Sequence, residues 1–171
     1  MRALALAALL ATSSAAQQFE TGGMVGYSVT DGDDQTRSAN PIYGASFRWP
    51  AGTGHSLQAD YSFIDFEARI YSRHFITGSW VRAARRGTVR PFFQAGAGVY
   101  IENTEIQLVK LPPGVPRSAL QTTSTDFCLV FGTGATVDLG SGFFLRPMLR
   151  AYLYVGPTLT YAPAITAGVR F

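Results

Sequence analysis

The most constraining feature of this chain is a two-residue alternation that recurs along nearly all of its length after residue 17. Gly, Thr, Tyr, Phe and Val recur in segments whose apolar and polar side chains alternate, and no such segment places apolar residues at helical spacing. A period of two puts successive side chains on opposite faces of a strand. The sequence therefore predicts an all-β chain.

Turn and loop residues divide the alternating region into eight predicted strands. We expect these strands at residues 19–30, 41–49, 55–66, 70–83, 90–102, 122–138, 143–154 and 159–171. The connections at 31–40 and 103–121 are long, whereas those at 50–54, 84–89 and 139–142 are short and built from turn residues. Long loops at one end and tight turns at the other are typical of an antiparallel up-and-down barrel that crosses an outer membrane.

In the alternating part of seven of these strands, charge falls on only one face. In the third strand, for example, Leu57 and Tyr61 share the uncharged face, while Asp60 lies on the other. The charges that we select on the second face as candidates for a lumen network are Glu20, Arg48, Asp60, Asp126, Asp138, Arg146, Arg150 and Arg170. The strand at 70–83 has no clean alternation, so the sequence does not assign a face to His74 or Trp80. Alternation also does not say which face is inside, since a soluble barrel would turn its charges to water.

Two features place the charged face inside. Aromatic residues gather on the uncharged face near the short turns, as expected of an interfacial girdle, at Phe19, Trp49, Phe93, Phe143 and Phe171. The charged face is rich in glycine, at Gly26, Gly44, Gly96, Gly98, Gly132, Gly134 and Gly168. The interior of an eight-stranded barrel is just wide enough for side chains, so small residues are needed opposite large ones. We therefore predict an eight-stranded transmembrane barrel with oily residues outside, such as Leu57, Phe127, Leu149 and Ile165.

Enclosed charges are costly unless they are paired. We expect the inward acids and arginines to form a network that plugs the lumen, with Asp60 and Arg150 near the middle of the barrel. A plugged barrel indicates a structural or surface-display role rather than general diffusion, for which larger barrels are used. Pro147 and Pro163 lie inside predicted strands, and we expect a β-bulge at each.

The N-terminus has the organisation of a signal peptide. Arg2 precedes an apolar run at residues 3–11, and Ser14-Ala15-Ala16 supplies the small residues that a signal peptidase needs. We expect cleavage after Ala16, which leaves residues 17–171 as an exported barrel domain.

The last strand resembles that of the OmpA/OmpX-like superfamily of outer-membrane barrels. Its outward positions are apolar or aromatic and end in phenylalanine: Tyr161, Ile165, Ala167, Val169 and Phe171. Residues 91–100 also resemble the fifth strand of that family, and the resemblance covers residues 19–171. It implies localisation in the outer membrane, contact with lipid and lipopolysaccharide, and a C-terminal signal read by the barrel-assembly machinery.

Signatures of enzyme chemistry are missing from the sequence. It has no glycine-rich phosphate loop, no His-Glu-x-x-His zinc helix and no Gly-x-Ser-x-Gly elbow. It also lacks the His-x-Ser motif of outer-membrane lipid A deacylases. Cys128 has no disulfide partner, and we expect it to face the lumen as a small packing residue. The net charge of +3 is spread along the chain, so nucleic acid is not expected as a partner. We predict no catalytic residue, cofactor or metal.

Two other functions remain open from the sequence. The 103–121 loop, whose residues 105–111 we expect to continue the strands above the membrane, could act as an adhesin by adding a strand to an extracellular protein. Alternatively, the chain could be a soluble secreted lipocalin-like barrel that binds a small apolar ligand. The acidic run at residues 31–34 could hold a divalent cation, although such a run is more often a solvated turn.

Overall fold

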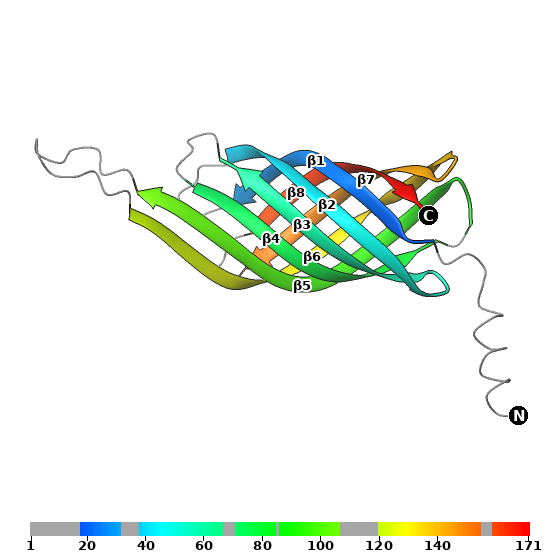
Figure 1. Ribbon diagram of the computed structural model, residues 1–171, viewed down its shortest axis with the longest axis horizontal. Helices are drawn as coiled ribbons and strands as arrows, with labels where there is room; N and C mark the ends of the chain where they lie inside the picture. Colours follow the sequence, from blue (N-terminus) through cyan, green and yellow to red (C-terminus); the bar gives the residue numbers. More distant parts are fainter. Residues whose placement is uncertain (1–17, 32–37, 67–70, 85, 107–119, 155–158) are drawn as a thin grey trace, which may run out of the picture.

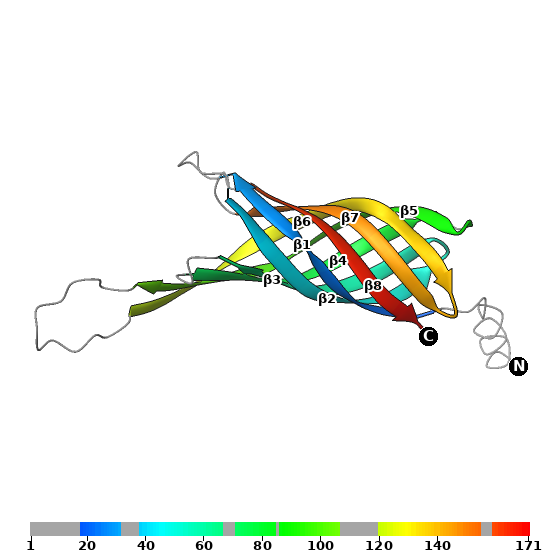
Figure 2. The ribbon, with the colours of Figure 1, turned by 90° about the horizontal axis from the view of Figure 1, so that it is seen from above.

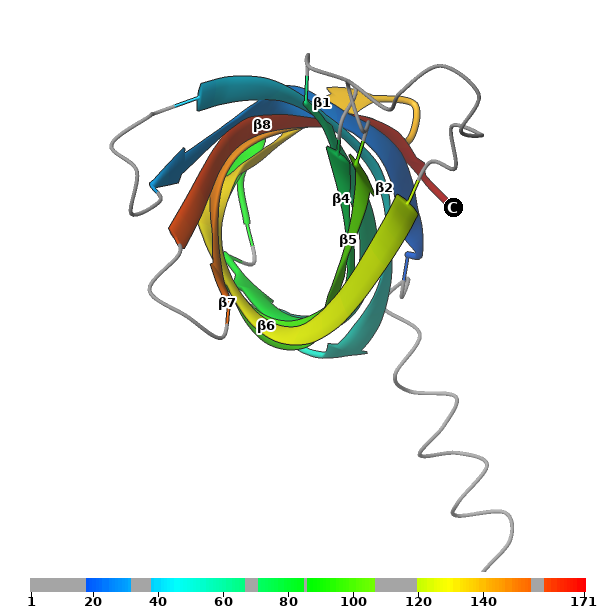
Figure 3. The same ribbon diagram turned by 90° about the vertical axis from the view of Figure 1, so that its left-hand side faces the viewer.

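The computed structural model describes residues 18–31, 38–66, 71–84, 86–106, 120–154 and 159–171. Its strands are β1 (Glu20–Asp31), β2 (Ser38–Gly52), β3 (His55–Asp65), β4 (Tyr71–Ala83), β5 (Val89–Ile106), β6 (Leu120–Gly140), β7 (Phe143–Tyr154) and β8 (Leu159–Arg170). Each strand pairs antiparallel with the next, and β1 pairs with β8, which closes the sheet into a barrel (Figures 1 and 3). The expected all-β, eight-stranded up-and-down barrel is confirmed. No helix within these ranges is long and apolar enough to cross a membrane.

The apolar faces of the strands point outward and the charged faces point inward. On the outside, Leu149 is 47% exposed and Ile165 is 52% exposed. On the inside, Asp60 is 5% exposed and Arg150 is 1% exposed. Leu57 and Phe127 are exposed as well. The arrangement is the inverse of a soluble protein, as the alternation and the inward glycines predict.

Strand β4, which the sequence does not orient, follows the same rule with a more mixed composition. Phe75, Thr77 and Val81 are buried inside the barrel. His74 and Trp80 therefore lie on the outer face. This strand puts large apolar side chains inside and an imidazole outside, which is why its alternation alone does not reveal its orientation.

The β-bulges expected at Pro147 and Pro163 do not occur. Pro147 stays paired with Ile165 of β8, and the β6–β7 register is the same on both sides of it. Likewise, Pro163 stays paired with Leu149, and the β1–β8 register is unchanged around it. A proline lacks an N–H toward only one neighbouring strand, so the ladder loses pairs on that side and keeps its register. The register instead shifts next to the tight turns, between Pro50 and Gly52 and between 138 and 140.

Strands β5 and β6 are longer than the sequence predicts and extend beyond the barrel wall as a hairpin (Figures 1 and 2). Their pairing continues to Ile106 and Leu120. The neighbouring strand β4 begins only at Tyr71, which pairs with Thr104 of β5. The expected continuation of the strand through residue 105 is confirmed as far as residue 106 of β5. The rest of the 103–121 loop and most of the acidic run at 31–34 lie outside the described residues.

Candidate functional site

Glu20 is the centre of a buried cluster of charges. The cluster lies at the end of the barrel where β1 begins and β8 ends. The strand register places Glu20 directly opposite Arg48 on β2 and Arg170 on β8. Arg170 donates to its Oε1 from Nε at 3.0 Å and from Nη2 at 2.8 Å. Arg48 forms an ion pair with Oε2 at 3.6 Å, and Arg146 on β7 donates to the same oxygen. One carboxylate thus joins four strands.

Arg170 also links Glu20 to a second acid, Asp138 on β6. Its Nη1 donates to Oδ1 of Asp138 at 2.9 Å, and Arg90 on β5 donates to the same atom at 3.0 Å. Arg90 belongs to the network although the sequence analysis did not select it. The signal was its position in the strand, since it shares an inward face with Gln94.

A chain of hydrogen bonds extends the cluster to the middle of the barrel. Arg48 donates from Nε to Oε1 of Gln58 at 2.7 Å, and the Gln58 amide donates to Asp60 at 2.8 Å. Arg150 then donates from Nη2 to Oδ1 of Asp60 at 2.7 Å. The network therefore contains seven of the eight charged residues that we selected from the sequence, together with Arg90 and the neutral Gln58.

Arginines outnumber acids in this network. The arginines are Arg48, Arg90, Arg146, Arg150 and Arg170, and the acids are Glu20, Asp60 and Asp138. The excess positive charge lies against aromatic rings. The Arg146 guanidinium is 4.5 Å from the centre of the Phe144 ring, and that of Arg48 is 5.3 Å from the Phe92 ring. Such cation–π contacts are strongest where water is excluded, as it is around these two arginines.

Asp126, by contrast, lies outside the network. Its side chain is exposed, and its Oδ2 accepts a long hydrogen bond of 3.5 Å from the Tyr100 hydroxyl. The prediction that it joins the lumen charges is wrong for a physical reason. Its position in β6 puts it on the inward side of the sheet. However, β7 ends at Tyr154, which pairs with Cys128, so Asp126 lies two residues beyond the part of β6 that pairs with β7.

A second ion pair lies toward the loop end of the interior. Arg73 on β4 donates from Nε to Oε2 of Glu102 on β5 at 2.6 Å. Rings separate this pair from the main network, since Tyr152 contacts Phe75 at 4.4 Å and Tyr154 contacts Tyr100 at 4.7 Å between ring centres. The pair is not predicted from the sequence because the face of β4, which carries Arg73, is unassigned, although Glu102 shares the inward face of Gln94 on β5.

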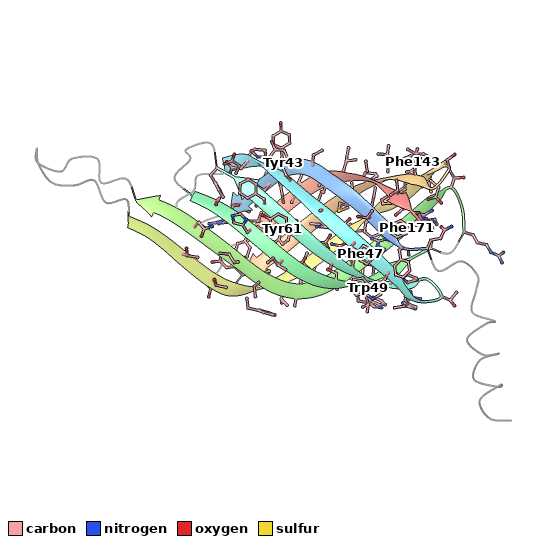
Figure 4. All side chains as sticks on the ribbon, viewed as in Figure 1. Tyr43, Phe47, Trp49, Tyr61, Phe143 and Phe171 are labelled. Atoms are coloured by element: carbon pink, nitrogen blue, oxygen red, sulfur yellow. The ribbon has the colours of Figure 1, made fainter. Side chains whose placement is uncertain are left out.

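The aromatic residues expected in a girdle do lie on the outer surface near the short turns. The ring of Phe19 stacks on Phe47 at 6.0 Å and on Phe171 at 6.2 Å. Phe47 also contacts Trp49, and both lie on β2 near the end that carries Phe171 (Figure 4). Phe93 and Phe143 are exposed on the same outer surface. The residues proposed as the assembly signal, Tyr161, Ile165, Ala167, Val169 and Phe171, all face outward. Phe171 also exchanges two backbone hydrogen bonds with Phe19.

His74 has two hydroxyl neighbours on the outer face. Its Nδ1 lies 2.8 Å from the Tyr61 hydroxyl and its Nε2 lies 3.4 Å from the Ser72 hydroxyl. A serine beside an imidazole has the elements of a nucleophile and a base. However, Nδ1 contacts a tyrosine rather than the carboxylate that orients the imidazole in a Ser-His-Asp triad. We assign no catalytic role to this group.

The fold and the site define a class of protein: a closed eight-stranded barrel with an apolar exterior and a paired, charged interior. No family model matches the sequence, and neither does any curated protein. Solved structures do match. Neisserial surface protein A has a TM-score of 0.73 at 12% identity, covering 90% of this chain and 97% of its own. Ail, the attachment invasion locus protein of Yersinia pestis, has a TM-score of 0.64 at 12% identity, covering 91% and 99%.

A third similar structure is the N-terminal β-barrel domain of Pseudomonas aeruginosa OprF. Its TM-score is 0.62 at 14% identity, and the match covers 91% of this chain and 98% of that domain. Each comparison spans almost the whole of both chains. The chain therefore shares the fold of small outer-membrane β-barrels, as its last strand suggests.

Proposed function

We propose that this protein is a small outer-membrane β-barrel with a structural or surface-display role, exported by a signal peptide at residues 1–16. The inversion of its faces supports this proposal. The outer surface presents large apolar side chains such as Val25, Ile76 and Phe131, which water would not favour, while arginines are enclosed. Both chain ends and the short turns then lie on the periplasmic side, and contacts with lipid and lipopolysaccharide follow from the same surface.

The barrel interior is proposed to be plugged. The observation that carries this proposal is the buried ion network, in which Arg146 and Arg150 are at most 1% exposed. Two charged side chains shielded from water in this way leave little room for a continuous aqueous path. The rings of Phe75, Tyr152 and Tyr154 close the next level of the interior.

The test of membrane insertion starts from cell envelopes. An outer-membrane barrel stays in the membrane pellet through high-salt and carbonate washes, and the detergent-extracted protein migrates differently on a gel before and after boiling. Release by carbonate without detergent would instead favour the soluble lipocalin-like alternative.

The plug is tested separately. Planar bilayers that contain the purified barrel are expected to show no sustained conductance. Sustained conductance that Arg150→Ala leaves unchanged would contradict the plug.

A second candidate function is adhesion through the 103–121 loop. It is favoured by the edge that the β5–β6 hairpin presents. Residues 120–127 of β6 pair with β5 but with no described residue of β7, whose pairing begins at Cys128. An unpaired edge can accept a strand from another protein. The similar structure from Yersinia pestis is named as an attachment invasion locus protein, and it has also been solved with a heparin analogue.

Deletion of residues 103–121 tests this candidate. The shortened barrel is expected to keep its heat-modifiable mobility, because the main ion network does not involve the loop. Cells that display it are expected to lose binding to immobilised matrix proteins and heparin. A matched control deletes only residues 107–119 and retains the paired strands. If binding survives both deletions, or never occurs with the intact chain, the adhesin function is wrong.

A further inference from the structure

A pocket of about 460 Å³ opens at the short-turn end of the barrel. The turn between β2 and β3 forms one wall, through Gly54 and His55, and the facing ends of β4 and β5 form the other, through Arg82, Pro91 and Phe93. The backbone N–H of Ala83 donates to the carbonyl of Gly54 at 2.9 Å, which fixes the two walls to each other.

Three of these residues form a row across the outer face of the sheet. The strand registers place His55 of β3 opposite Arg82 of β4, and Arg82 opposite Phe93 of β5. One step further along β4, the ring of Trp80 stacks on the His55 imidazole with 5.3 Å between ring centres. Trp80 and Phe93 are both partly exposed on the outer surface. The row therefore combines a cation and an imidazole with two exposed aromatic rings.

The position of Arg82 is unusual for this barrel. Among the outward-facing strand positions whose side chains the structure describes, the charged residues are Asp31, Asp65 and Arg82. The two acids lie at the loop end, and Arg82 alone lies at the turn end. Its guanidinium is exposed, and the described residues offer it no carboxylate partner. An arginine near the end of a membrane-spanning segment turns its charge toward the headgroup layer.

His55 supplies a second polar group. Its Nδ1 is buried and has no hydrogen-bond partner among the described residues. A buried polar atom without a partner is costly. A small turn of the imidazole toward the pocket that it lines would let a ligand oxygen accept a hydrogen bond from Nδ1, in the tautomer that carries the proton there. The pocket thus offers a cation and a further donor to a single anionic group.

We propose that this pocket binds the phosphate of a phospholipid headgroup in the periplasmic leaflet. This inference rests on the proposed membrane location. Arg82 matches a phosphate with two parallel N–H donors, and His55 donates a third hydrogen bond. Trp80 and Phe93 lie against the glycerol and the first methylenes of the acyl chains, where interfacial aromatic rings are usual. A free inorganic phosphate would leave these rings without a partner.

The experiment uses the full-length barrel in neutral detergent, with the imidazole signals followed by NMR. The chain has two histidines, and His74 lies on the outer face away from the pocket, so it is an internal control. Three probes are titrated: dihexanoylphosphatidylglycerol, the phosphate-free dihexanoylglycerol, and inorganic phosphate. The first is expected to shift the His55 signal and leave His74 unchanged, and the other two are expected to shift neither.

Variants separate a defined site from general charge attraction. Arg82→Gln is expected to weaken the apparent affinity at His55 by about fivefold, the contribution of one basic residue near a lipid surface. Arg86→Gln removes an exposed arginine of the adjacent turn that does not line the pocket, and is expected to have no effect. If Arg82→Gln fails to fold, Arg82→Lys keeps the charge and loses the paired donors, so a smaller loss is expected.

Several results would overturn the proposal. Equal losses of affinity in Arg82→Gln and Arg86→Gln would show unspecific charge attraction. A shift of the His74 signal as large as that of His55 would show general partition of the lipid onto the barrel. A shift of the His55 signal with inorganic phosphate alone would show that the pocket binds a free anion. Because the titration is done in detergent, it is independent of where the protein resides in the cell. Membrane fractionation tests the proposed function separately, so the two failures are distinguishable.

Discussion

Arg150 on β7 and Asp60 on β3 form an ion pair across the interior of the barrel, with Nη2 and Oδ1 2.7 Å apart. These strands are not neighbours in the sheet, so the contact joins two separate parts of the wall. Gln58 and Arg48 connect this pair to the Glu20 cluster. The interior therefore contributes to stability through specific pairs rather than through apolar packing alone.

The first prediction concerns this pair. Asp60→Asn leaves Arg150 buried without its counter-charge, and we expect the free energy of unfolding in lipid vesicles to fall by about 3–5 kcal/mol. The double variant Asp60→Leu with Arg150→Met removes both charges and is expected to recover most of that loss. Urea titration followed by tryptophan fluorescence measures both. An equal loss in the single and double variants would contradict the argument.

The second prediction compares two acids of the same network. Glu20→Gln leaves three arginines close together in a buried site, and we expect it to destabilise the barrel by at least about 3 kcal/mol. Asp138 is more exposed, with 31% of its side chain accessible, so Asp138→Asn is expected to cost about 1 kcal/mol or less. Urea midpoints at constant m-value measure the difference. Similar midpoints for both variants would show that burial does not set the cost.

The third prediction concerns the inward glycines. A Cβ added at Gly98 would lie 2.1 Å from the carbonyl oxygen of Ile76, whereas a Cβ at Gly23 on the outer face would meet nothing within 4 Å. Gly98→Ala is therefore expected to destabilise the barrel by about 1–3 kcal/mol, the usual cost of overpacking. Gly23→Ala is the matched control and should be neutral or slightly stabilising, because Gly weakens a strand. Refolding yield in detergent is a second readout.

The fourth prediction uses Cys128 as a reporter of the interior. Its side chain is fully buried between the strands that line the lumen. We expect a charged, water-soluble maleimide to leave the folded barrel unlabelled over hours and to label it completely in urea. Fast labelling of the folded barrel, with heat-modifiable mobility intact, would show an aqueous path and contradict the plug.

The fifth prediction tests the assembly signal. Phe171→Ala removes the terminal ring without removing the backbone bonds to Phe19, and Phe93→Ala removes another exposed ring from the same end of the barrel. If the assembly machinery reads the terminal residue, Phe171→Ala lowers the amount of barrel in the outer membrane much more than Phe93→Ala does. Both variants are expected to refold equally well in detergent. Equal amounts in cells would leave Phe171 without this role.

Sequence reasoning succeeds here where alternation and charge agree. Asp60 and Arg150 are recognisable as interior residues because apolar neighbours on both sides of each point the other way. Alternation gives a side of the sheet but not a depth along the barrel, which is why Asp126 is wrongly placed in the network. Arg73 was missed because β4 carries large apolar residues inside.

Strand register is also only partly visible in the sequence. Pro147 suggests a disrupted strand, but one missing donor does not change the register when the other edge of the strand stays paired. Conversely, the cross-strand pairs of Glu20 with Arg48 and Arg170 could not be derived without the turn lengths that set the register.

The shared carboxylate of Glu20 has a consequence for the order of folding. Its hydrogen-bond donors Arg146 and Arg170 lie on β7 and β8, which follow the other six described strands in the sequence, although Glu20 itself begins β1. Until β7 and β8 join the sheet, Glu20 in the β1–β2 hairpin therefore lacks the two arginines that donate to it. The barrel closes and the charge of Glu20 is neutralised in the same step, when β8 pairs with β1. A chain without β8 gains neither, so partly assembled barrels are expected to be unstable.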